Sequence, residues 1–491
     1  MPRLICLAVL GTMLATRGLG QTTFATLTGA VTDPNGSVIP GAIVEVTQSG
    51  SNYRYTAKSN EAGIYTLGQL REGVYTLTAR NAGFKEAVIQ NIQLVALDVR
   101  RLDVHLEIGA VETKVEVSAG ATVIETETAR ISDSKGATLI NSLPLNTRSL
   151  SAFLALSPGV LQAGAGSSTR RFAGSRANQE DMTVDGITVA NGYDGTQIGP
   201  LYSYIESFQE FRIDMANNTA EFGAIGQVTV VSKAGTNQLH GTGLDYYGTP
   251  MFRARDPFAL QRPSGVSHSL GAAVNGPVAL PRIYNGHNKT FFTFVFETSR
   301  GSQIQQLLNP TMPLPSWRQG DFSALAPATI VRDPFAGNAP FAGNRIPASR
   351  INPVSQRIQD LFFPLPNFGD NSTLRSQNYR EQKPRPYDPS TNITTREDHR
   401  FSDKAFIFGR FTWDRQYSRQ YTGNLPTIGQ NWQTRSTRGI NISYTHSIRP
   451  NLLNEFRYGF AYNNNPRNPP TLGKEVAQFL AEDLKKLKAA P

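Results

Sequence analysis

Residues 440–462, INISYTHSIRPNLLNEFRYGFAY, alternate between two kinds of side chain. In the first part, every second residue is isoleucine, tyrosine or histidine, with asparagine, serine or threonine between them. After a turn at 449–451, four aromatic residues alternate with Arg457, Gly459 and Ala461. Alternation over about 10 residues is typical of transmembrane β-strands, whose apolar side chains face lipid. Strands of soluble sandwiches also alternate, but four aromatic residues on one face favour a membrane hairpin.

Seven segments, this hairpin included, carry the alternation and are predicted as strands of one antiparallel membrane sheet. They are 239–248, 266–278, 290–300, 392–401, 405–415, 434–448 and 452–462. The connections alternate between short, as at 402–404, and long, as at 301–390. Short turns on one side and long loops on the other are a property of membrane barrels. The longest loop either covers a pore, contacts a ligand or packs as a surface loop, and the residues leave these alternatives open.

The composition excludes several classes of protein. The chain has 491 residues and a formal net charge of +10, with 43 glycines, 30 prolines and 18% charged residues. This mixture excludes a coiled coil, an all-helical bundle and an acidic disordered chain. No apolar run after the N-terminus approaches the ~18 residues of a membrane helix. Lysine and arginine cluster in pairs at most, without the basic stripe of a nucleic-acid-binding surface, so no nucleic acid is expected as a partner.

No arrangement of residues predicts catalysis, a cofactor or a metal. The six histidines are dispersed and lack zinc-binding spacing. The single cysteine, Cys6, lies in the N-terminal apolar stretch. The sequence has neither a Gly-x-Ser-x-Gly elbow nor a Gly-Lys-Ser/Thr phosphate loop. We therefore expect a protein that is not an enzyme and that uses no cofactor.

The first 20 residues are predicted to be a secretory signal peptide. A positive start at Arg3 precedes a mostly apolar stretch, and Gly18 and Gly20 place small residues before Gln21. Cleavage after Gly20 would remove the only cysteine, so the exported chain would have no disulfide. A large β-structure that pairs its own backbone can be stable without disulfides.

Residues 24–108 contain short strand patterns between turn signals, which predict a small β-sandwich. The expected strands are 26–31, 43–46, 63–67, 73–79 and 99–108. The strings GAVTDPNG at 29–36, PGAIV at 40–44, NEAGIY at 60–65 and LREGVYTL at 70–77 resemble the carboxypeptidase regulatory-like domain. This resemblance implies an accessory sandwich and not a peptidase. Because the family belongs to the carbohydrate-binding-like folds, the domain is either a rigid spacer or a site of glycan contact.

The next part of the chain carries a second resemblance. Its strings are RFAGSRANQ at 171–179, MTVDGI at 182–187, IESFQEFR at 205–212 and QVTVVSKAGTN at 227–237. In this order they are similar to the plug domain of TonB-dependent outer-membrane transporters, in the Oar-like branch that carries a sandwich in front. The resemblance implies a strand before an Asp-Gly turn, a helix bearing the Ile-Glu pattern and a valine-rich strand.

The same resemblance implies functional residues and partners. A short strand at 111–119, between sandwich and plug, could accept a strand of TonB along its edge. The candidate residues for that contact are Val115, Glu116, Val117 and Ser118. Charges that pair plug with barrel and rearrange on energisation are expected at Arg171, Arg212, Glu210 and Glu221. The implied partners are TonB, outer-membrane lipid and a large solute such as a glycan or a peptide.

The expected fold class is mainly β and the chain divides into four parts. These are a signal peptide at 1–20, an Ig-like sandwich at 22–110, a TonB-contacting region with a small α+β plug at 111–238, and the first strands of an antiparallel transmembrane barrel at 239–491. Plugged transporters have about 22 strands, and the chain ends in a helical pattern at 473–488. We therefore expect an N-terminal fragment or truncated form of a transporter.

Two functions are consistent with these residues. The first is a TonB-dependent receptor or transporter for energised uptake of a large solute, located in the outer membrane with its N-terminal domain in the periplasm. The second is a secreted or cell-surface carbohydrate-binding β-protein without transport activity. The lipid-facing aromatic alternation and the plug strings favour the first function.

Overall fold

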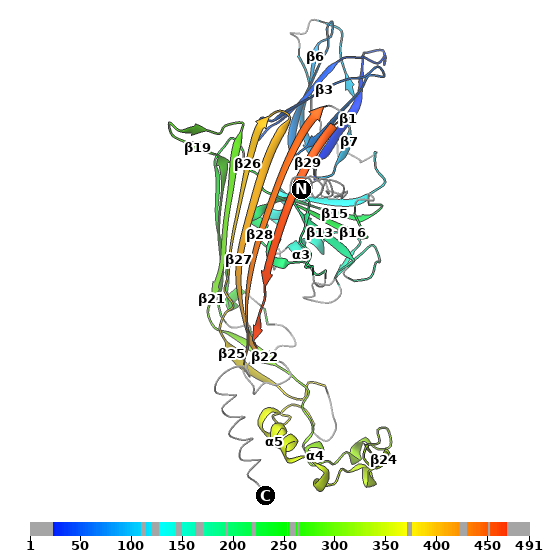
Figure 1. The fold of residues 1–491 in the computed structure, drawn as a ribbon, viewed down its shortest axis with the longest axis vertical. Coiled ribbons are helices and arrows are strands. Elements are labelled where there is room, and N and C mark those ends of the chain that lie inside the picture. The colour runs from blue at the N-terminus through cyan, green and yellow to red at the C-terminus, as the bar shows by residue number, and fades with distance from the viewer. Residues whose placement is uncertain are drawn as a thin grey trace, which may run out of the picture.

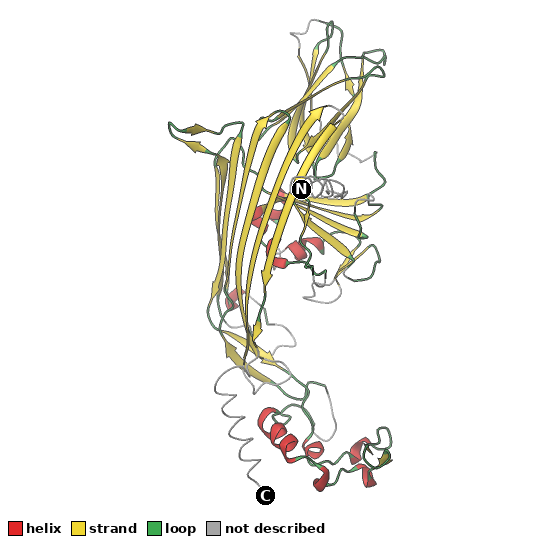
Figure 2. Ribbon diagram, in the orientation of Figure 1, coloured by secondary structure: helices red, strands yellow, loops and turns green. Residues whose placement is uncertain are grey.

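The computed structural model describes residues 23–109, 114–118, 127–143, 150–162, 170–177, 179–192, 195–218, 222–252, 254–255, 262, 265–370, 376–421, 430–449 and 452–468. The predicted signal peptide, Glu221 and the helical pattern at 473–488 lie outside these residues. The described part is mainly β, which confirms the expected fold class. Figures 1 and 2 show a long curved sheet with a smaller sheet on one face and a sandwich at one end.

The N-terminal unit is a β-sandwich. One sheet has the order β4-β1-β7, with β8 also paired to β1, and the other has the order β3-β2-β5-β6-β9. The strands are β1 (Ala25–Thr32), β2 (Ile43–Gln48), β3 (Arg54–Lys58), β4 (Ile64–Leu70), β5 (Gly73–Arg80), β6 (Glu86–Leu94), β7 (Val99–Arg101), β8 (Val104–His105) and β9 (Lys114–Ser118). Alternate residues of β1 and β5 are buried, including Leu27, Tyr75 and Leu77, and form an apolar core between the sheets.

The sandwich differs from the prediction in three strands. β3 and β6 were not expected, and the single strand expected over 99–108 is broken into β7 and β8. β3 is the edge strand of its sheet, and its inward-facing residues, Tyr55 and Ala57, are only half-buried, so the strand is weakly marked in the sequence. The interruption falls at Leu102 and Asp103, where Leu102 N–H donates to Thr28 O and Asp103 Oδ1 accepts from Ala30 N–H.

The middle unit is built on a five-stranded sheet of order β10-β15-β16-β13-β14. β13 runs parallel to β16, and the other pairs are antiparallel. Its elements are β10 (Ile131–Gly136), α2 (Ala137–Ser142), α3 (Leu150–Leu154), β11 (Val160–Gln162), β12 (Arg170–Phe172), β13 (Glu180–Val184), β14 (Ile187–Thr188), η1 (Gly199–Leu201), η2 (Ile205–Ser207), β15 (Phe208–Ala216) and β16 (Gly226–Ser232). A second apolar core, with Phe153, Phe211 and Val228, packs the helices against this sheet.

The helix expected over 205–212 is wrong. Only Ile205–Ser207 forms a 3-10 turn, and Phe208–Ala216 is strand β15. β15 is paired on both edges, with β10 and β16, and nearly all its side chains are buried. A strand covered on both faces shows no alternation of apolar and polar residues, so the usual sequence signal of a strand is missing here.

The C-terminal unit is one large antiparallel sheet of order β17-β18-β21-β26-β27-β28-β29, with the short β30 also paired to β28. The strands are β17 (His240–Gly248), β18 (Ser267–Pro277), β21 (Thr290–Gly301), β26 (Ser390–Ser402), β27 (Ala405–Tyr421), β28 (Gln430–Arg449), β29 (Leu452–Asn464) and β30 (Arg467–Asn468). All seven predicted strands are present, and β27 continues beyond its predicted end. In the described residues the sheet is open along β17 and β29 (Figure 1).

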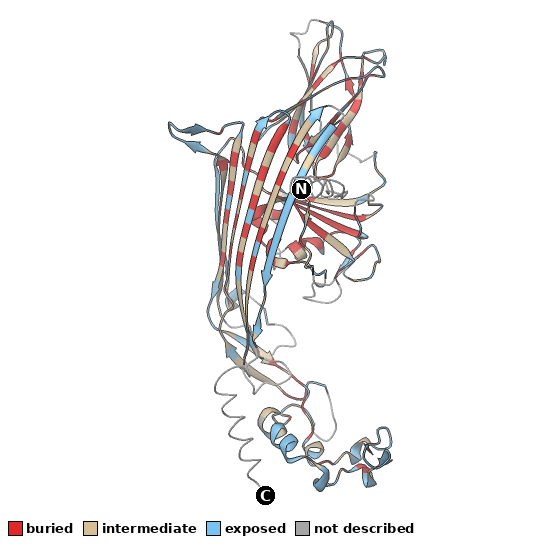
Figure 3. Ribbon diagram, viewed as in Figure 1, coloured by how far each residue is buried: buried red, intermediate tan, exposed pale blue. Residues whose placement is uncertain are grey.

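The two faces of the large sheet differ in chemistry. On the inner face, which carries the middle unit, Asp398, Thr412 and Thr445 are buried. On the outer face, Phe294 and Phe460 are exposed. Figure 3 shows buried positions along the strands that lie against the middle sheet and an exposed edge strand β29. The polar face is therefore the one covered by protein, as the alternation predicted.

The connections of the large sheet are short at the sandwich end and long at the opposite end. β26 and β27 are joined at 403–404, whereas β21 and β26 are joined by residues 302–389. The long connection contains β22 (Ile304–Leu308), α4 (Pro315–Arg318), η4 (Ser323–Leu325), β23 (Arg332–Asp333), β24 (Ala339–Pro340), η5 (Ala342–Asn344), η6 (Ala348–Arg350), α5 (Pro353–Phe362) and β25 (Glu381–Arg385). At the sandwich end, β18 and β21 are joined through a small hairpin of β19 (Ala279–Leu280) and β20 (Tyr284–Asn285).

A short 3-10 turn, η3 (Pro250–Phe252), follows β17. None of the described helices is both long enough and apolar enough to span a membrane.

Candidate functional site

The inner face of β26 carries charged residues where the large sheet meets the other two units. Alternate positions 396, 398 and 400 are arginine, aspartate and arginine, and all three side chains are buried. A membrane strand can bury charges only on the face turned away from lipid, and buried charges need partners. Their partners come from three different parts of the chain.

Arg396 joins the large sheet to the middle sheet. Its Nε and Nη2 atoms donate to the two oxygens of Asp398, both at 2.9 Å. Its Nη1 donates to Ser232 Oγ at 2.7 Å and to Ser232 O at 3.0 Å, and lies 3.4 Å from Oδ1 of Asp185. The ring of Phe408 lies under the guanidinium, with the Arg396 carbon 4.3 Å from the ring centre. This planar fork holds two carboxylates at once, which a lysine could not do.

Asp185 and Ser232 are positioned by the middle sheet. Asp185 begins the Asp-Gly turn between β13 and β14 with φ 53°, a left-handed conformation that aspartate tolerates. Its carboxylate accepts from the backbone N–H of Ser232 at 2.9 Å and from Ser232 Oγ at 2.8 Å. Ser232 ends β16 beside this turn, so the pair forms a fixed acceptor for Arg396.

Arg71 extends the same network into the sandwich. It lies in the turn between β4 and β5, and its Nη1 donates to Asp398 Oδ1 at 2.8 Å. Both side chains are buried, and the Arg71 guanidinium lies 4.5 Å from the ring centre of Phe406 on β27. Asp398 therefore has two arginine partners, one on its own strand and one from the sandwich. We call Arg71, Asp185, Ser232, Arg396 and Asp398 the central charge network.

Arg400 makes a second contact between the large sheet and the sandwich. Its Nη2 donates to the carbonyl oxygen of Arg54 at 2.7 Å, and its guanidinium lies 4.4 Å from the ring centre of Tyr53. The Tyr53 ring packs against Phe291 of β21 at 5.8 Å. Cation–π contacts of this kind contribute most where water is excluded.

Three further hydrogen bonds attach the middle unit to the large sheet. Tyr204 Oη donates to Asp414 Oδ2 at 2.6 Å, and Arg410 Nη2 donates to Leu201 O at 3.1 Å. Asn441 Nδ2 donates to Val184 O at 3.1 Å. These contacts lie on β27 and β28, and with Arg396 on β26 they spread over three neighbouring strands, so the interface between the two units is broad and polar.

Two of the predicted charges, Glu210 and Arg212, are buried where the middle sheet meets the sandwich rather than the large sheet. Both reach Ala96, in the turn between β6 and β7: Glu210 Oε1 accepts from Ala96 N–H at 3.0 Å, and Arg212 Nη1 donates to Ala96 O at 3.1 Å. Arg212 also donates to Asp214 Oδ1 at 3.0 Å and to Ser132 Oγ at 2.9 Å. Together they bind both backbone polar groups of one residue of the sandwich.

The Glu210 carboxyl is strongly perturbed by its surroundings. Burial and the nearby carboxyl of Glu72 raise the pKa of Glu210 to about 8, while the hydrogen bond from Ala96 acts in the opposite direction. Burial also raises the pKa of Glu72. Because desolvation disfavours the charged form of a carboxyl, Glu210 is mainly protonated at neutral pH.

The other predicted residues lie elsewhere. Arg171 is exposed on β12, whereas its neighbour Arg170 is buried and lies 3.3 Å from Glu180. The positions Val115, Glu116, Val117 and Ser118 lie on β9, which pairs in parallel with β6 and is the last strand of its sheet. Glu221 lies outside the described residues.

Sequence reasoning did not identify the members of the central charge network. The available signal was the run Asn392, Thr394, Arg396, Asp398 and Arg400, in which every second residue of a membrane strand is polar or charged. Such a run must face inward and must meet partners there. Its partners lie between 164 and 327 residues away in the chain, so their identity required the structure.

The described residues contain no group of three or more histidine, cysteine, aspartate or glutamate side chains that could hold a metal ion. The central charge network has arginines beside its carboxylates, which balances the charge without a cation. Its arrangement holds the three units together.

Comparison with known families identifies two parts of the chain. A family described as outer membrane beta barrel domain matches residues 231–487, which is more than half of the sequence. The chain therefore belongs to the outer membrane beta barrel domain family, and the membrane in which its large sheet lies is an outer membrane. Residues 26–107 match the carboxypeptidase regulatory-like domain.

Similar solved structures overlap only partly with this chain. The siderophore receptor PirA from Pseudomonas aeruginosa is 10% identical with a TM-score of 0.38, covering 68% of this chain and 41% of its own. Hydroxyquinol 1,2-dioxygenase from Pseudomonas putida DLL-E4 is 10% identical with a TM-score of 0.16, covering 18% of this chain and 57% of its own. Chlorocatechol 1,2-dioxygenase from Pseudomonas putida is 12% identical with a TM-score of 0.15, covering 17% and 60%. The chain thus spans less than two thirds of the length of each. No curated protein matches the chain.

Proposed function

We propose that this chain acts in a TonB-dependent, Oar-like outer-membrane receptor that takes up a large solute, such as a glycan or a peptide, and that it is not an enzyme. In this proposal the middle unit is the plug, the sandwich lies in the periplasm, and TonB is the partner that supplies the force. The observation that carries the proposal is the middle sheet held against the inner face of the membrane sheet by the central charge network.

The contact between plug and membrane sheet is suited to repeated separation. If the two units move apart, Arg396 keeps both hydrogen bonds to Asp398, and Asp185 keeps its hydrogen bonds from Ser232. Only the Asp185 carboxylate loses its arginine, and it stays hydrogen-bonded to Ser232, which limits the cost of an unpaired charge. The polar groups released from the interface also regain hydrogen bonds to water. The network therefore holds the plug in place without making its displacement prohibitive.

The sandwich has to move before or together with the plug. It contacts the plug through Ala96 and the membrane sheet through Arg71, so it bridges both units. Separating Arg71 from Asp398 leaves Arg71 without its carboxylate, unlike Arg396, which keeps Asp398 when the plug moves. In this proposal the sandwich is a clamp that must yield to force before a path for solute opens.

Strand β9 supplies a place for that force to act. β9 carries the candidate TonB-contacting residues, and in the described residues one of its edges is paired to β6 while no strand pairs with the other. A free edge can accept a partner strand through backbone hydrogen bonds. Pulling β9 away from β6 would strain the sandwich, whose contacts hold the plug.

Cysteine crosslinking to TonB tests this proposal directly. Single cysteines are placed at Val115, Glu116, Val117 and Ser118 in a full chain in which Cys6 is replaced by serine, and disulfide formation with cysteines in TonB is scored in cells. We expect crosslinks at these positions. Thr56→Cys is the matched control, because Thr56 is exposed on β3, the opposite edge of the same sheet. Equal crosslinking at Thr56, or none at β9, would contradict the proposal.

The alternative of a secreted carbohydrate-binding protein does not account for the outer-membrane family or for the lipid-facing aromatic strands. Fractionation provides the corresponding test. A receptor partitions with the outer membrane and requires detergent for extraction, whereas recovery in the culture medium without detergent would favour the alternative.

A further inference from the structure

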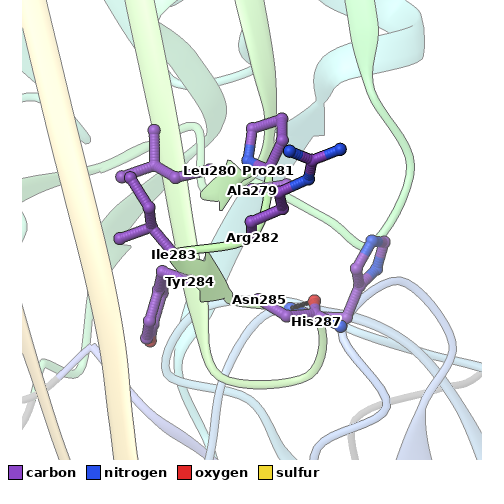
Figure 4. A pocket seen from close by; sticks show the side chains of 8 residues that line it. All are labelled: Ala279, Leu280, Pro281, Arg282, Ile283, Tyr284, Asn285 and His287. Atoms are coloured by element: carbon purple, nitrogen blue, oxygen red, sulfur yellow. Dashed lines mark hydrogen bonds between the residues drawn. The ribbon is translucent and has the colours of Figure 1, made fainter.

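The hairpin of β19 and β20 has two chemically different sides. Its residues 279–285 are all exposed, and Ile283 at its tip is 82% exposed. Figure 4 shows the side chains of Leu280, Ile283 and Tyr284 on one side of the hairpin, and those of Arg282 and His287 on the other. A cavity of about 480 Å³ lies between them. The hairpin is therefore a small amphipathic element without a protein partner in the described part of the chain.

A belt of aromatic and histidine side chains indicates where this hairpin lies along the membrane normal. Tyr284 forms a hydrogen bond with Thr290, which forms another with His399 at 2.7 Å. His399 packs on Phe401 with ring centres 4.6 Å apart, and Phe401 packs on Tyr444 at 6.4 Å. All lie on the outer face near the sandwich end of the strands. Aromatic belts of this kind mark the boundary between lipid and water in membrane barrels.

A groove connects the hairpin to the lipid-facing surface. It has a volume of about 740 Å³; Leu239, Pro277, Leu280, Phe292 and Phe294 form the apolar part of its lining, and His287 and Glu397 belong to its polar part. Phe294 is exposed on the outer face of β21, and Leu239 is 71% exposed. In Figure 1 the hairpin projects sideways from the sheet, away from the middle unit. The groove is thus continuous with the surface that faces lipid, and lipid is the molecule available to fill it.

We propose that the hairpin β19–β20 is a phospholipid-binding element at the membrane boundary on the sandwich side. Leu280, Ile283 and Tyr284 lie among the acyl chains, an acyl chain occupies the groove, and Arg282 contacts the phosphate of the headgroup. This follows the general behaviour of amphipathic elements, which place apolar side chains below the headgroups and let arginine reach the phosphates. The assignment extends beyond solute uptake and needs only the outer-membrane location of the sheet.

Depth-dependent fluorescence quenching tests the proposal on the full chain in phospholipid vesicles. A bimane label is attached to Ile283→Cys in a chain carrying Cys6→Ser, and the vesicles contain phospholipid with a spin label near the headgroup end of its acyl chain. We expect strong quenching at this position. Phe294→Cys on the outer face is the positive control, and Ser37→Cys in an exposed turn of the sandwich is the negative control.

Quenching at Phe294 but not at Ile283 would overturn the proposal, because the hairpin would then lie in water. Absence of quenching at both positions would overturn it together with the lipid-facing assignment of the sheet.

A second measurement tests the contact between Arg282 and the phospholipid headgroup. With spin-labelled phosphatidylglycerol in place of phosphatidylcholine, local quenching at Ile283→Cys should rise, up to about fivefold, as expected for one arginine near anionic lipid. Arg282→Gln should remove this preference; an unchanged preference would contradict the contact with phosphate.

Discussion

The sandwich and the membrane sheet use the same alternating pattern with opposite orientation. In the sandwich the apolar residues of each strand face inward, where Leu27, Tyr75 and Leu77 form a core. In the membrane sheet the polar residues face inward, where Asp398 and Thr445 are buried, and the apolar residues face lipid. Alternation alone therefore shows that the two faces of a strand lie in different environments. It does not show which face is covered by protein, because this is the apolar face in the sandwich and the polar face in the membrane sheet.

The largest loss of stability is expected when a charge is removed from the inner face of the membrane sheet. Asp398→Ala leaves Arg71 and Arg396 buried without their shared carboxylate. We expect a loss of about 3–5 kcal/mol in the free energy of unfolding, measured by thermal or denaturant unfolding in detergent. Glu397→Ala is the matched control, because the adjacent Glu397 is exposed on the outer face. Equal stability of the two variants would show that the charge network does not hold the units together.

A charge on the outer face distinguishes lipid from water. Phe460 on β29 and Ile64 on β4 are similarly exposed, at 46% and 43%. Phe460→Arg should destabilise the chain in lipid vesicles by about 2–4 kcal/mol, because the arginine would face hydrocarbon. Ile64→Arg should change stability by less than about 0.5 kcal/mol. Folding into vesicles measures both, and a harmless Phe460→Arg would mean that this face is not in lipid.

A smaller effect is expected where the two sheets approach most closely. A Cβ atom added to Gly459 on β29 would overlap the Cγ2 atom of Ile187 on β14. Gly459→Ala should therefore cost about 1–3 kcal/mol, as overpacking does. Gly409→Ala on β27 meets no heavy atom within 4 Å and should be neutral or stabilising. The pair is compared by thermal unfolding in detergent, and identical melting temperatures would exclude this close contact.

The contact between the sandwich and the middle unit makes the free energy of unfolding depend on pH. The pKa of Glu210 is raised from 4.5 to about 8, so the folded state binds a proton that the unfolded state releases between these values. Stability is then full below about pH 4.5 and falls with rising pH, by about 1.4 kcal/mol per unit, until about pH 8.

Glu210→Gln keeps an oxygen for the Ala96 N–H but cannot ionise. We expect this variant to lose the Glu210 contribution to the pH dependence and to exceed the parent in stability above pH 8. Unfolding is measured between pH 4.5 and 9 in both chains. A parallel pH dependence in the two would show that Glu210 does not titrate in this range.

The sequence predicted the membrane sheet better than the other units. The strands β17, β18, β21, β26, β28 and β29 fall close to their predicted positions because long strands between lipid and a polar interior alternate over many residues. β15 and β16 are buried on both faces and give no such signal. The helix at the Ile-Glu pattern is implied by the resemblance alone, and only Ile205–Ser207 forms a 3-10 turn there. β3 of the sandwich gives a weak signal because, at the edge of its sheet, its two core-facing residues Tyr55 and Ala57 are only half-buried.

The candidate site was predictable in its chemistry but not in its pairs. Charges that pair the middle unit with the membrane sheet were expected at Glu210 and Arg212; both are buried, but both contact Ala96 of the sandwich. The link from Arg71 to Asp398 joins residues 327 positions apart. No local pattern encodes such a contact, because it depends on how three separately folded units are placed.

The order of the units along the chain has a consequence for assembly. Asp185 and Ser232 are paired within the middle sheet, and Arg71 lies in the sandwich, before Arg396 and Asp398 are added in β26. Each of the two earlier units has its own apolar core. The strands of the membrane sheet would then form against the sandwich and the middle unit, which already present hydrogen-bond acceptors for the arginines of the sheet. A strand shifted by one residue would turn Arg396 and Asp398 toward lipid. The contacts with the two earlier units therefore also favour the correct register of the sheet.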